Sequence, residues 1–343
     1  MLSLPASWSA ACDRGKTLLP GFLVVLVLAC LAVMLSAQYA GPVMLYGLLF
    51  GLAANRLSQL ATLLPGINLA ASQILRLGVA LLGSRIVLGD VAALGWLTIV
   101  WVLAGVLVCL IFGSMLARAC RMSTEFAVLS SGAVAICGAS AALAIAAVLP
   151  RREDSDRQLL MVVVAVTALS TLAMIVYPLL VQWLALDDQQ AGVFIGASIH
   201  DVAQVMGAGY MVSEATGDTA ALVKLMRVAC LVPVVFGLNL LWRNAEAATT
   251  NASDRRKPAL LPWFLLAFVA LMLLNSLLAP PVLLLDSMQS MSRWCLLLAV
   301  TALGVKTQWT DLMTLGYRPV MALCAQTLLL ALFALAGILL VLT

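Results

Sequence analysis

The sequence predicts an all-α polytopic membrane protein with about 9–11 transmembrane segments, two of them interrupted, in the inverted-repeat architecture of secondary transporters. The first observation is composition: 64% of the 343 residues are hydrophobic, 10% are charged, and the mean hydropathy is +1.11. A soluble domain is about half apolar and about a quarter charged. We therefore expect one transmembrane domain over residues 1–343, surrounded by the lipid bilayer.

The second observation is the length of the apolar runs, since a transmembrane helix needs about 20 apolar residues. Residues 1–36 are expected to form an extra N-terminal helix, because no small-residue cleavage site clearly follows them. Two segments, 124–149 and 189–213, are hydrophobic but interrupted. The candidate spans cover residues 18–36, 42–55, 68–88, 95–116, 158–184, 219–242, 260–279, 292–309 and 318–342.

The third observation is an internal duplication, in which Leu75–Trp96 matches Leu296–Tyr317. Leucines match easily between membrane helices, whereas polar residues, glycines and prolines do not. We therefore expect repeat-related segments 42–184 and 189–342. The informative matches are Gly83 with Gly304, Arg85 with Lys306, Asp90 with Asp311, Gly95 with Gly316, Pro42 with Pro262 and Asn55 with Asn275.

The basic loop residues set the expected orientation, because lysine and arginine are enriched in cytoplasmic loops. The N-terminus and the polar loop Arg243–Pro258 are expected inside. The loop 151–157 carries three acids and three arginines and leaves two topologies open. If 124–149 crosses fully, this loop is outside. If 124–149 is a re-entrant hairpin, the loop is inside, 189–213 is a hairpin from the outer face, and the repeats are inverted. We favour inverted repeats.

The two interrupted segments share the tripeptide Gly-Ala-Ser at their centres. It occurs as Gly138, Ala139 and Ser140, and again as Gly196, Ala197 and Ser198. Glycine permits non-helical backbone, and serine is a good helix N-cap. Each centre therefore predicts a break followed by a new helix N-terminus. The alternative is an ordinary packing face, since small residues are common where membrane helices touch.

Two helix N-termini in mid-membrane would present free amides and positive dipole ends, an arrangement that suits an anion. The expected donors are the amides at both Gly-Ala-Ser centres and the hydroxyls of Ser140 and Ser198. Lys224 and Arg227 lie three residues apart on one helical face and are expected to add positive charge. The alternative for both is snorkelling to the membrane interface.

His200 is the only histidine of the chain and follows the second centre. Its ordinary titration range makes it a candidate coupling group for protons. Asp201 does not share its helical face, whereas Gln204, four residues on, does. The alternative is a neutral histidine held by hydrogen bonds between packed helices.

The sequence lacks the motifs of metal sites and of ATP-driven transport. The eight cysteines form no C-x-x-C pair, so neither a metal site nor a cofactor is expected. No P-loop occurs, so coupling to H⁺ or Na⁺ is the expected energy source. An anion channel remains an alternative. An intramembrane enzyme using Ser198 and His200 is disfavoured by their spacing, and we expect no catalytic residue and no nucleic-acid partner.

The motifs ICGASAA (136–142), GASIHDVAQV (196–205), KLMRV (224–228) and LRLGVALLGSRI (75–86) resemble the YeiH family. This is a group of bacterial inner-membrane proteins labelled sulfate exporters. The resemblance extends over nearly the whole chain. It implies a secondary carrier with inverted repeats and supports a sulfate-like or sulfonate-like anion as substrate. A homodimer is left open.

Overall fold

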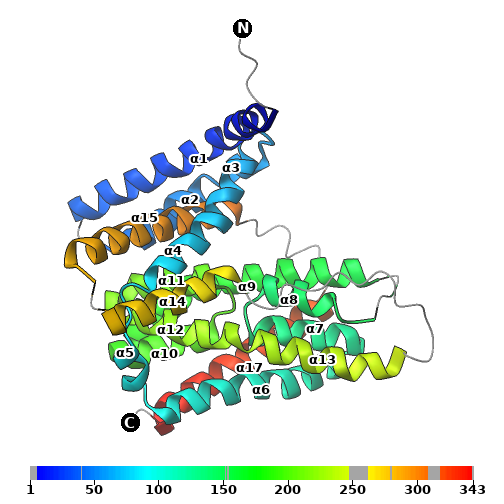
Figure 1. Cartoon of the computed structure of the whole chain (residues 1–343). Coiled ribbons are helices and arrows are strands. Elements are labelled where there is room, and N and C mark those ends of the chain that lie inside the picture. Colours follow the sequence, from blue (N-terminus) through cyan, green and yellow to red (C-terminus); the bar gives the residue numbers. More distant parts are fainter. Residues whose placement is uncertain are drawn as a thin grey trace. The chain divides into compact units, whose positions relative to one another are not determined.

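The computed structural model describes residues 6–39, 41–150, 152, 154–246, 262–278, 280–307 and 317–341, and every regular element in these ranges is a helix (Figure 1). Within these ranges, seven helical stretches are long and apolar enough to cross a membrane, and three shorter helices are also apolar. The chain is therefore an all-α polytopic membrane protein. It forms two compact units, residues 1–87 with 267–307, and residues 88–266 with 308–343. The single-domain organisation stays a prediction.

Each predicted span corresponds to a helix, but some bounds differ: the run 292–309 begins ten residues after the start of the helix Val282–Lys306. The predicted runs 42–55 and 260–279 form helices shorter than a full span, α2 (Val43–Ala53) and α14 (Trp263–Leu278). The other seven correspond to Thr17–Tyr39, Leu64–Leu82, Trp96–Ala119, Ser155–Trp183, Glu214–Trp242, Val282–Lys306 and Tyr317–Leu340.

The first unit is held together by close contact between helices far apart in the sequence. Helix α15 packs along α2 and α4. Gly51 of α2 meets Gly304 of α15 so closely that a Cβ on Gly304 would lie 2.9 Å from the Cα of Gly51. The matched residues Asp311 and Gly316 lie outside the described residues. The unit comprises α1 (Ala6–Tyr39), α2, η1 (Asn55–Gln59), α3 (Leu64–Leu69), η2 (Ala70–Ile74), α4 (Leu75–Leu82), the end of α14, and α15 (Val282–Lys306).

The second unit contains both interrupted segments. Helix α12 packs against both α10 and α11, and α6 packs against α7 and α17. The unit comprises α5 (Leu88–Ala93), α6 (Trp96–Ala119), α7 (Thr124–Ala135), α8 (Ala139–Ala146), α9 (Ser155–Trp183), α10 (Asp188–Ser198), α11 (Val202–Val212), α12 (Glu214–Ala229), α13 (Leu231–Glu246), the start of α14, and α17 (Tyr317–Val341).

Candidate functional site

The segment 124–149 folds back on itself. Helices α7 and α8 are separated by three non-helical residues, and Arg152 Nη2 lies 2.6 Å from Glu125 Oε1. Two collinear helices of this length would hold their outer ends about 30 Å apart. The ion pair instead joins the two ends, and Gly132 of α7 contacts Ile145 of α8. We call α7, α8 and the turn between them the first hairpin.

The segment 188–212 folds back in the same way. The Ser213 hydroxyl, directly after α11, donates to Asp188 Oδ1 at the start of α10, with an O–O distance of 2.5 Å. Thr216 Oγ1 donates to the same carboxylate at 2.9 Å. The two ends of the segment therefore meet. We call α10, α11 and the turn 199–201 the second hairpin. Of the two topologies considered from sequence, these contacts favour hairpins; their insertion from opposite membrane faces stays a prediction.

Arg227 of α12 binds the tips of both hairpins. A helix leaves its last carbonyl groups without intrahelical partners. All five N–H groups of Arg227 donate to such carbonyls, at 2.8–2.9 Å. Arginine has only five N–H donors, so none remains for a ligand. Arg227 is 1% exposed. The acceptors are Val134 and Ala135 at the end of α7, and Gly196 and Ile199 at the end of α10.

Lys224 also joins the two tips, but one of its N–H groups makes no hydrogen bond to them. Its ammonium group donates to the carbonyls of Ile136 (2.7 Å) and Ile199 (2.9 Å). A lysine has three N–H donors, so these two bonds leave one. The side chain is 0% exposed, so Lys224 and Arg227 both point into the second unit and neither snorkels to its surface.

Close helix packing lets α12 reach these carbonyls. A Cβ on Gly196 would lie 2.6 Å from the Ala220 carbonyl oxygen, and one on Gly192 would lie 2.5 Å from the Thr219 Cβ. The two glycines lie four residues apart on α10, the small-residue spacing typical of tight contacts between membrane helices. For Gly196 the packing-face interpretation is therefore the correct one.

The second Gly-Ala-Ser centre does not begin a helix, and that expectation was wrong. Gly196, Ala197 and Ser198 form the last turn of α10, which offers carbonyl groups rather than free amides. The Ser198 hydroxyl donates to the Phe194 carbonyl at 2.5 Å. The new helix, α11, begins at Val202, after the three non-helical residues 199–201.

The first Gly-Ala-Ser centre does begin a helix. Gly138 has φ +64° and ψ −125°, a conformation that favours glycine, and it is the N-cap of α8. Ala139 is half-buried and Ser140 is exposed. Their amides have no hydrogen-bond partner within the described ranges. The Ser140 hydroxyl lies 2.8 Å from the sulfur of Cys137. This helix start therefore keeps free donors three and four residues after Ile136, whose carbonyl accepts from Lys224 at 2.7 Å.

The turn of the second hairpin is tied to neighbouring helices through His200 and Asp201. Both of their backbone amides donate to the Ser170 hydroxyl of α9, at 3.1 Å. His200 Nε2 lies 2.9 Å from the Thr327 hydroxyl of α17. Sequence reasoning missed Ser170 and Thr327, although polar residues in otherwise apolar runs were a signal for them.

Gln204 and Asp201 occupy the first turn of α11. Asp201 is the N-cap, and its Oδ1 accepts from the Ala203 amide at 2.8 Å. Gln204 is 1% exposed and donates from Nε2 to the Thr171 hydroxyl at 3.1 Å. Its Oε1 is buried and has no partner within the part of the chain that the structure describes.

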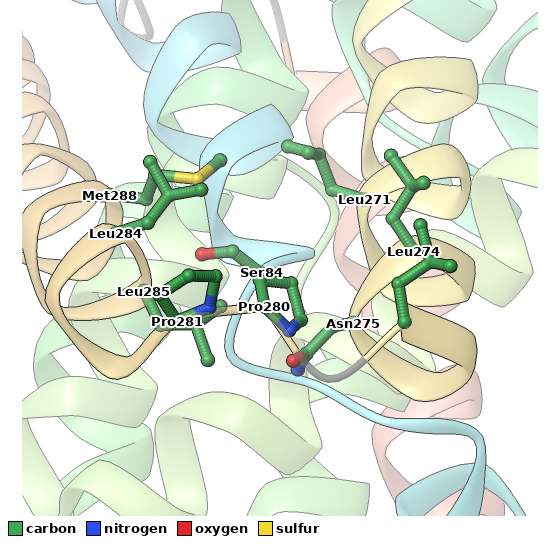
Figure 2. A pocket seen from close by; sticks show the side chains of 10 residues that line it. Ser84, Leu271, Leu274, Asn275, Pro280, Pro281, Leu284, Leu285 and Met288 are labelled. Carbon is green, nitrogen blue, oxygen red and sulfur yellow. The ribbon is translucent and has the colours of Figure 1, made fainter.

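Two cavities elsewhere do not suit an inorganic anion. One of about 380 Å³ lies in the first unit, where leucines of α14 and α15 face each other across Pro280 and Pro281 (Figure 2). Ser84 and Asn275 are its polar residues. Another, of about 480 Å³, lies in the second unit between α6, α7 and α13. No charged residue lines either cavity.

The family comparison and three similar relatives each match most of the length of the chain. Residues 20–323 match the family described as Conserved hypothetical protein 698. The chain is 46% identical over 330 residues to a UPF0324 membrane protein of Chlorobaculum tepidum, covering 96% of this chain and 91% of the relative. It is 46% identical over 320 residues to the UPF0324 membrane protein TauZ of Paracoccus pantotrophus, covering 93% and 94%. A UPF0324 membrane protein of Rhizobium meliloti is 45% identical over 318 residues, covering 93% and 92%. No solved structure matches the chain.

Proposed function

Because this chain belongs to the UPF0324 family of membrane proteins, as its YeiH-like motifs predicted, we propose that it is a secondary transporter of a small anion, sulfate or a sulfonate. The anion crosses the bacterial cytoplasmic membrane in exchange or symport with H⁺ or Na⁺. The N-terminus lies in the cytoplasm. The observation that carries the proposal is the enclosed pair of cations, Lys224 and Arg227, where two hairpin tips meet.

Electrostatics support an anion as the cargo. Ionisable groups within a membrane segment are costly and are typical of transport pathways. Lys224 has one N–H left, and the amides of Ala139 and Ser140 add two donors at the positive end of α8. Backbone amides at a helix N-terminus, together with an ammonium group, suit a tetrahedral oxyanion.

The candidate residues then divide by role. Lys224, Ala139 and Ser140 bind the anion, and Gly138 gives α8 its starting conformation. Arg227 is a positioning residue, because all its donors hold the hairpin tips. The small residues Gly196, Ala197 and Ser198 act through packing, and His200 and Gln204 shape the turn beside the site.

An intramembrane enzyme is the weaker candidate. A serine nucleophile needs a base within hydrogen-bond reach. The Ser198 hydroxyl donates to Phe194, and His200 Nε2 faces Thr327 instead. These contacts argue against Ser198 and His200 as a nucleophile and its base. An anion channel would use the same binding groups as the proposed transporter and differs in its kinetics.

Flux into proteoliposomes tests the proposal. The purified full chain is expected to give saturable uptake of labelled sulfate that responds to a gradient of H⁺ or Na⁺. Lys224→Met should abolish uptake, and protein-free liposomes supply the background. Uptake that never saturates would indicate a channel. Absence of uptake for sulfate and for every sulfonate tested would refute the proposed substrate class.

A further inference from the structure

Asp201 is the acidic residue at the tip of the second hairpin. It is half-buried, it is the N-cap of α11, and its Oδ1 accepts from the Ala203 amide at 2.8 Å. It also interacts electrostatically with Lys224 and with Cys137. The same turn supplies the Ile199 carbonyl, which accepts from the Lys224 ammonium group at 2.9 Å. Lys224 is the group to which the proposed function assigns the anion.

Three of the groups that interact with Asp201 come from neighbouring elements, and Ser170 does so through the Asp201 backbone amide. Lys224 of α12 is the cation, Cys137 of the first hairpin is a neutral thiol, and Ser170 of α9 is a neutral hydroxyl. His200 precedes Asp201 in the same turn. An anion bound at Lys224 would be repelled by an ionised Asp201. A cation that neutralises the carboxylate removes this repulsion, so cation and anion favour each other's binding equally.

Gln204 provides a second acceptor group in the same helical turn as Asp201. It lies three residues after Asp201, so the two side chains share a face of the first helical turn. Its amide orientation leaves Oε1, an acceptor, buried and without a partner in the described chain. An oxyanion has only acceptors to offer such an atom. A metal cation, or a proton carried on a neighbouring group, supplies what the oxygen lacks.

We propose that Asp201 is the coupling-ion site, where one H⁺ or one Na⁺ neutralises the carboxylate and thereby admits the anion to Lys224. This inference rests on the proposed function for its anion, and on Asp201 and Gln204 for its cation. It assigns the coupling role to Asp201 instead of His200, the residue expected from sequence.

Asp201→Asn is the informative variant, because asparagine caps a helix about as well as aspartate. It removes the charge and keeps the oxygen that accepts from Ala203. The experiment measures binding of labelled sulfate to the purified full chain, in a pH series in choline chloride and in a Na⁺ series at fixed pH. His200→Gln is the comparison variant.

In the wild type, sulfate affinity is expected to rise about 5–150-fold on acidification or on adding Na⁺, the range typical of coupled sites. If affinity rises in the pH series the coupling ion is H⁺, and if it rises in the Na⁺ series the coupling ion is Na⁺. Asp201→Asn should bind sulfate at the higher affinity under every condition. The inference is overturned if Asp201→Asn keeps the wild-type ion dependence, or if His200→Gln loses it while Asp201→Asn does not.

A second readout is independent of the anion. Thermal unfolding of both proteins is followed over the same pH and Na⁺ series without sulfate. A bound cation stabilises the native state, so the wild type should show an ion-dependent shift that Asp201→Asn lacks. Equal shifts in both proteins overturn the inference. If sulfate fails to bind but the shifts differ, the proposed substrate fails and the cation site stands.

Discussion

Replacing Arg227 by methionine tests whether this residue holds the hairpin tips together. The carbonyls of Ala135 and Gly196 would lose their only partner among the described residues, whereas Ile199 keeps Lys224 and Val134 keeps an interaction with the His200 side chain. A buried acceptor without a partner costs about 1–3 kcal/mol, so two cost roughly 2–6 kcal/mol. A typical protein is stable by only about 5–15 kcal/mol. Arg227→Met is therefore expected to unfold far below the wild-type temperature.

Lys224→Met is the matched variant, with the same new side chain on the same helix. Among the residues that the structure describes, it leaves only the Ile136 carbonyl without a partner, since Arg227 still donates to Ile199. The expected loss is about 1–3 kcal/mol, and the protein should remain folded. Because Lys224 carries the free N–H, this variant should lose sulfate binding.

Thermal unfolding in detergent micelles, with sulfate binding measured on the folded fraction, separates the two roles. Arg227→Lys is a third variant for this comparison. It keeps the positive charge but has at most three N–H donors in place of the five that arginine uses. It should be less stable than the wild type while keeping measurable sulfate binding. Equal stability of Arg227→Met and Lys224→Met would refute the reasoning, as would a fully stable Arg227→Lys that no longer binds sulfate.

The remaining predictions also use thermal unfolding. Gly138→Ala should cost about 1–3 kcal/mol through backbone strain alone, because the nearest atoms to a new Cβ lie 3.7 Å away; wild-type stability would contradict it. Gly196→Val should cost at least about 1–3 kcal/mol by forcing α10 from α12. Its control, Gly237→Ala, meets nothing within 4 Å and should gain about 0.5–1 kcal/mol; similar losses in both would exclude the packing explanation. Hydroxyl hydrogen bonds lower the pKa of Asp188 below its ordinary value of 3.8. Wild type should therefore be the more stable above pH 3.8, and this advantage over Asp188→Asn should vanish as the pH falls through the lowered pKa; a pH-independent difference would contradict this account.

The membrane spans could be predicted because they depend on local composition. A run of about 20 apolar residues suffices for a transmembrane helix wherever it occurs. The run 158–184 differs from the helix Ser155–Trp183 by only a few residues. Hairpins could not be separated from full spans in this way. That distinction depends on contacts between distant residues, such as the ion pair of Arg152 with Glu125. The loop 151–157 carries little topological information, because its three acids balance its three arginines.

The two Gly-Ala-Ser centres show where pattern reasoning fails. Gly138 has a positive φ and precedes a helix, whereas Gly196 lies inside one and packs on α12. Glycine serves both purposes, through its freedom of φ and through its lack of a Cβ. Which purpose applies depends on Ala220 and Val223, more than twenty residues away. The sequence motif alone therefore predicted the first helix start correctly and the second one incorrectly.

The chemistry of the two cations explains why arginine and lysine occupy different positions. The tips end in carbonyls whose directions are fixed by α7 and α10, and a planar guanidinium with five donors can satisfy several at once. That group stays charged and has no donor left over, which suits a permanent cross-link. An ammonium group is compact and keeps one donor free at Lys224. The negative helix ends are therefore neutralised by protein, whereas the amides of Ala139 and Ser140 are not. The proposed anion would complete this arrangement, because it brings hydrogen-bond acceptors and negative charge to these amides.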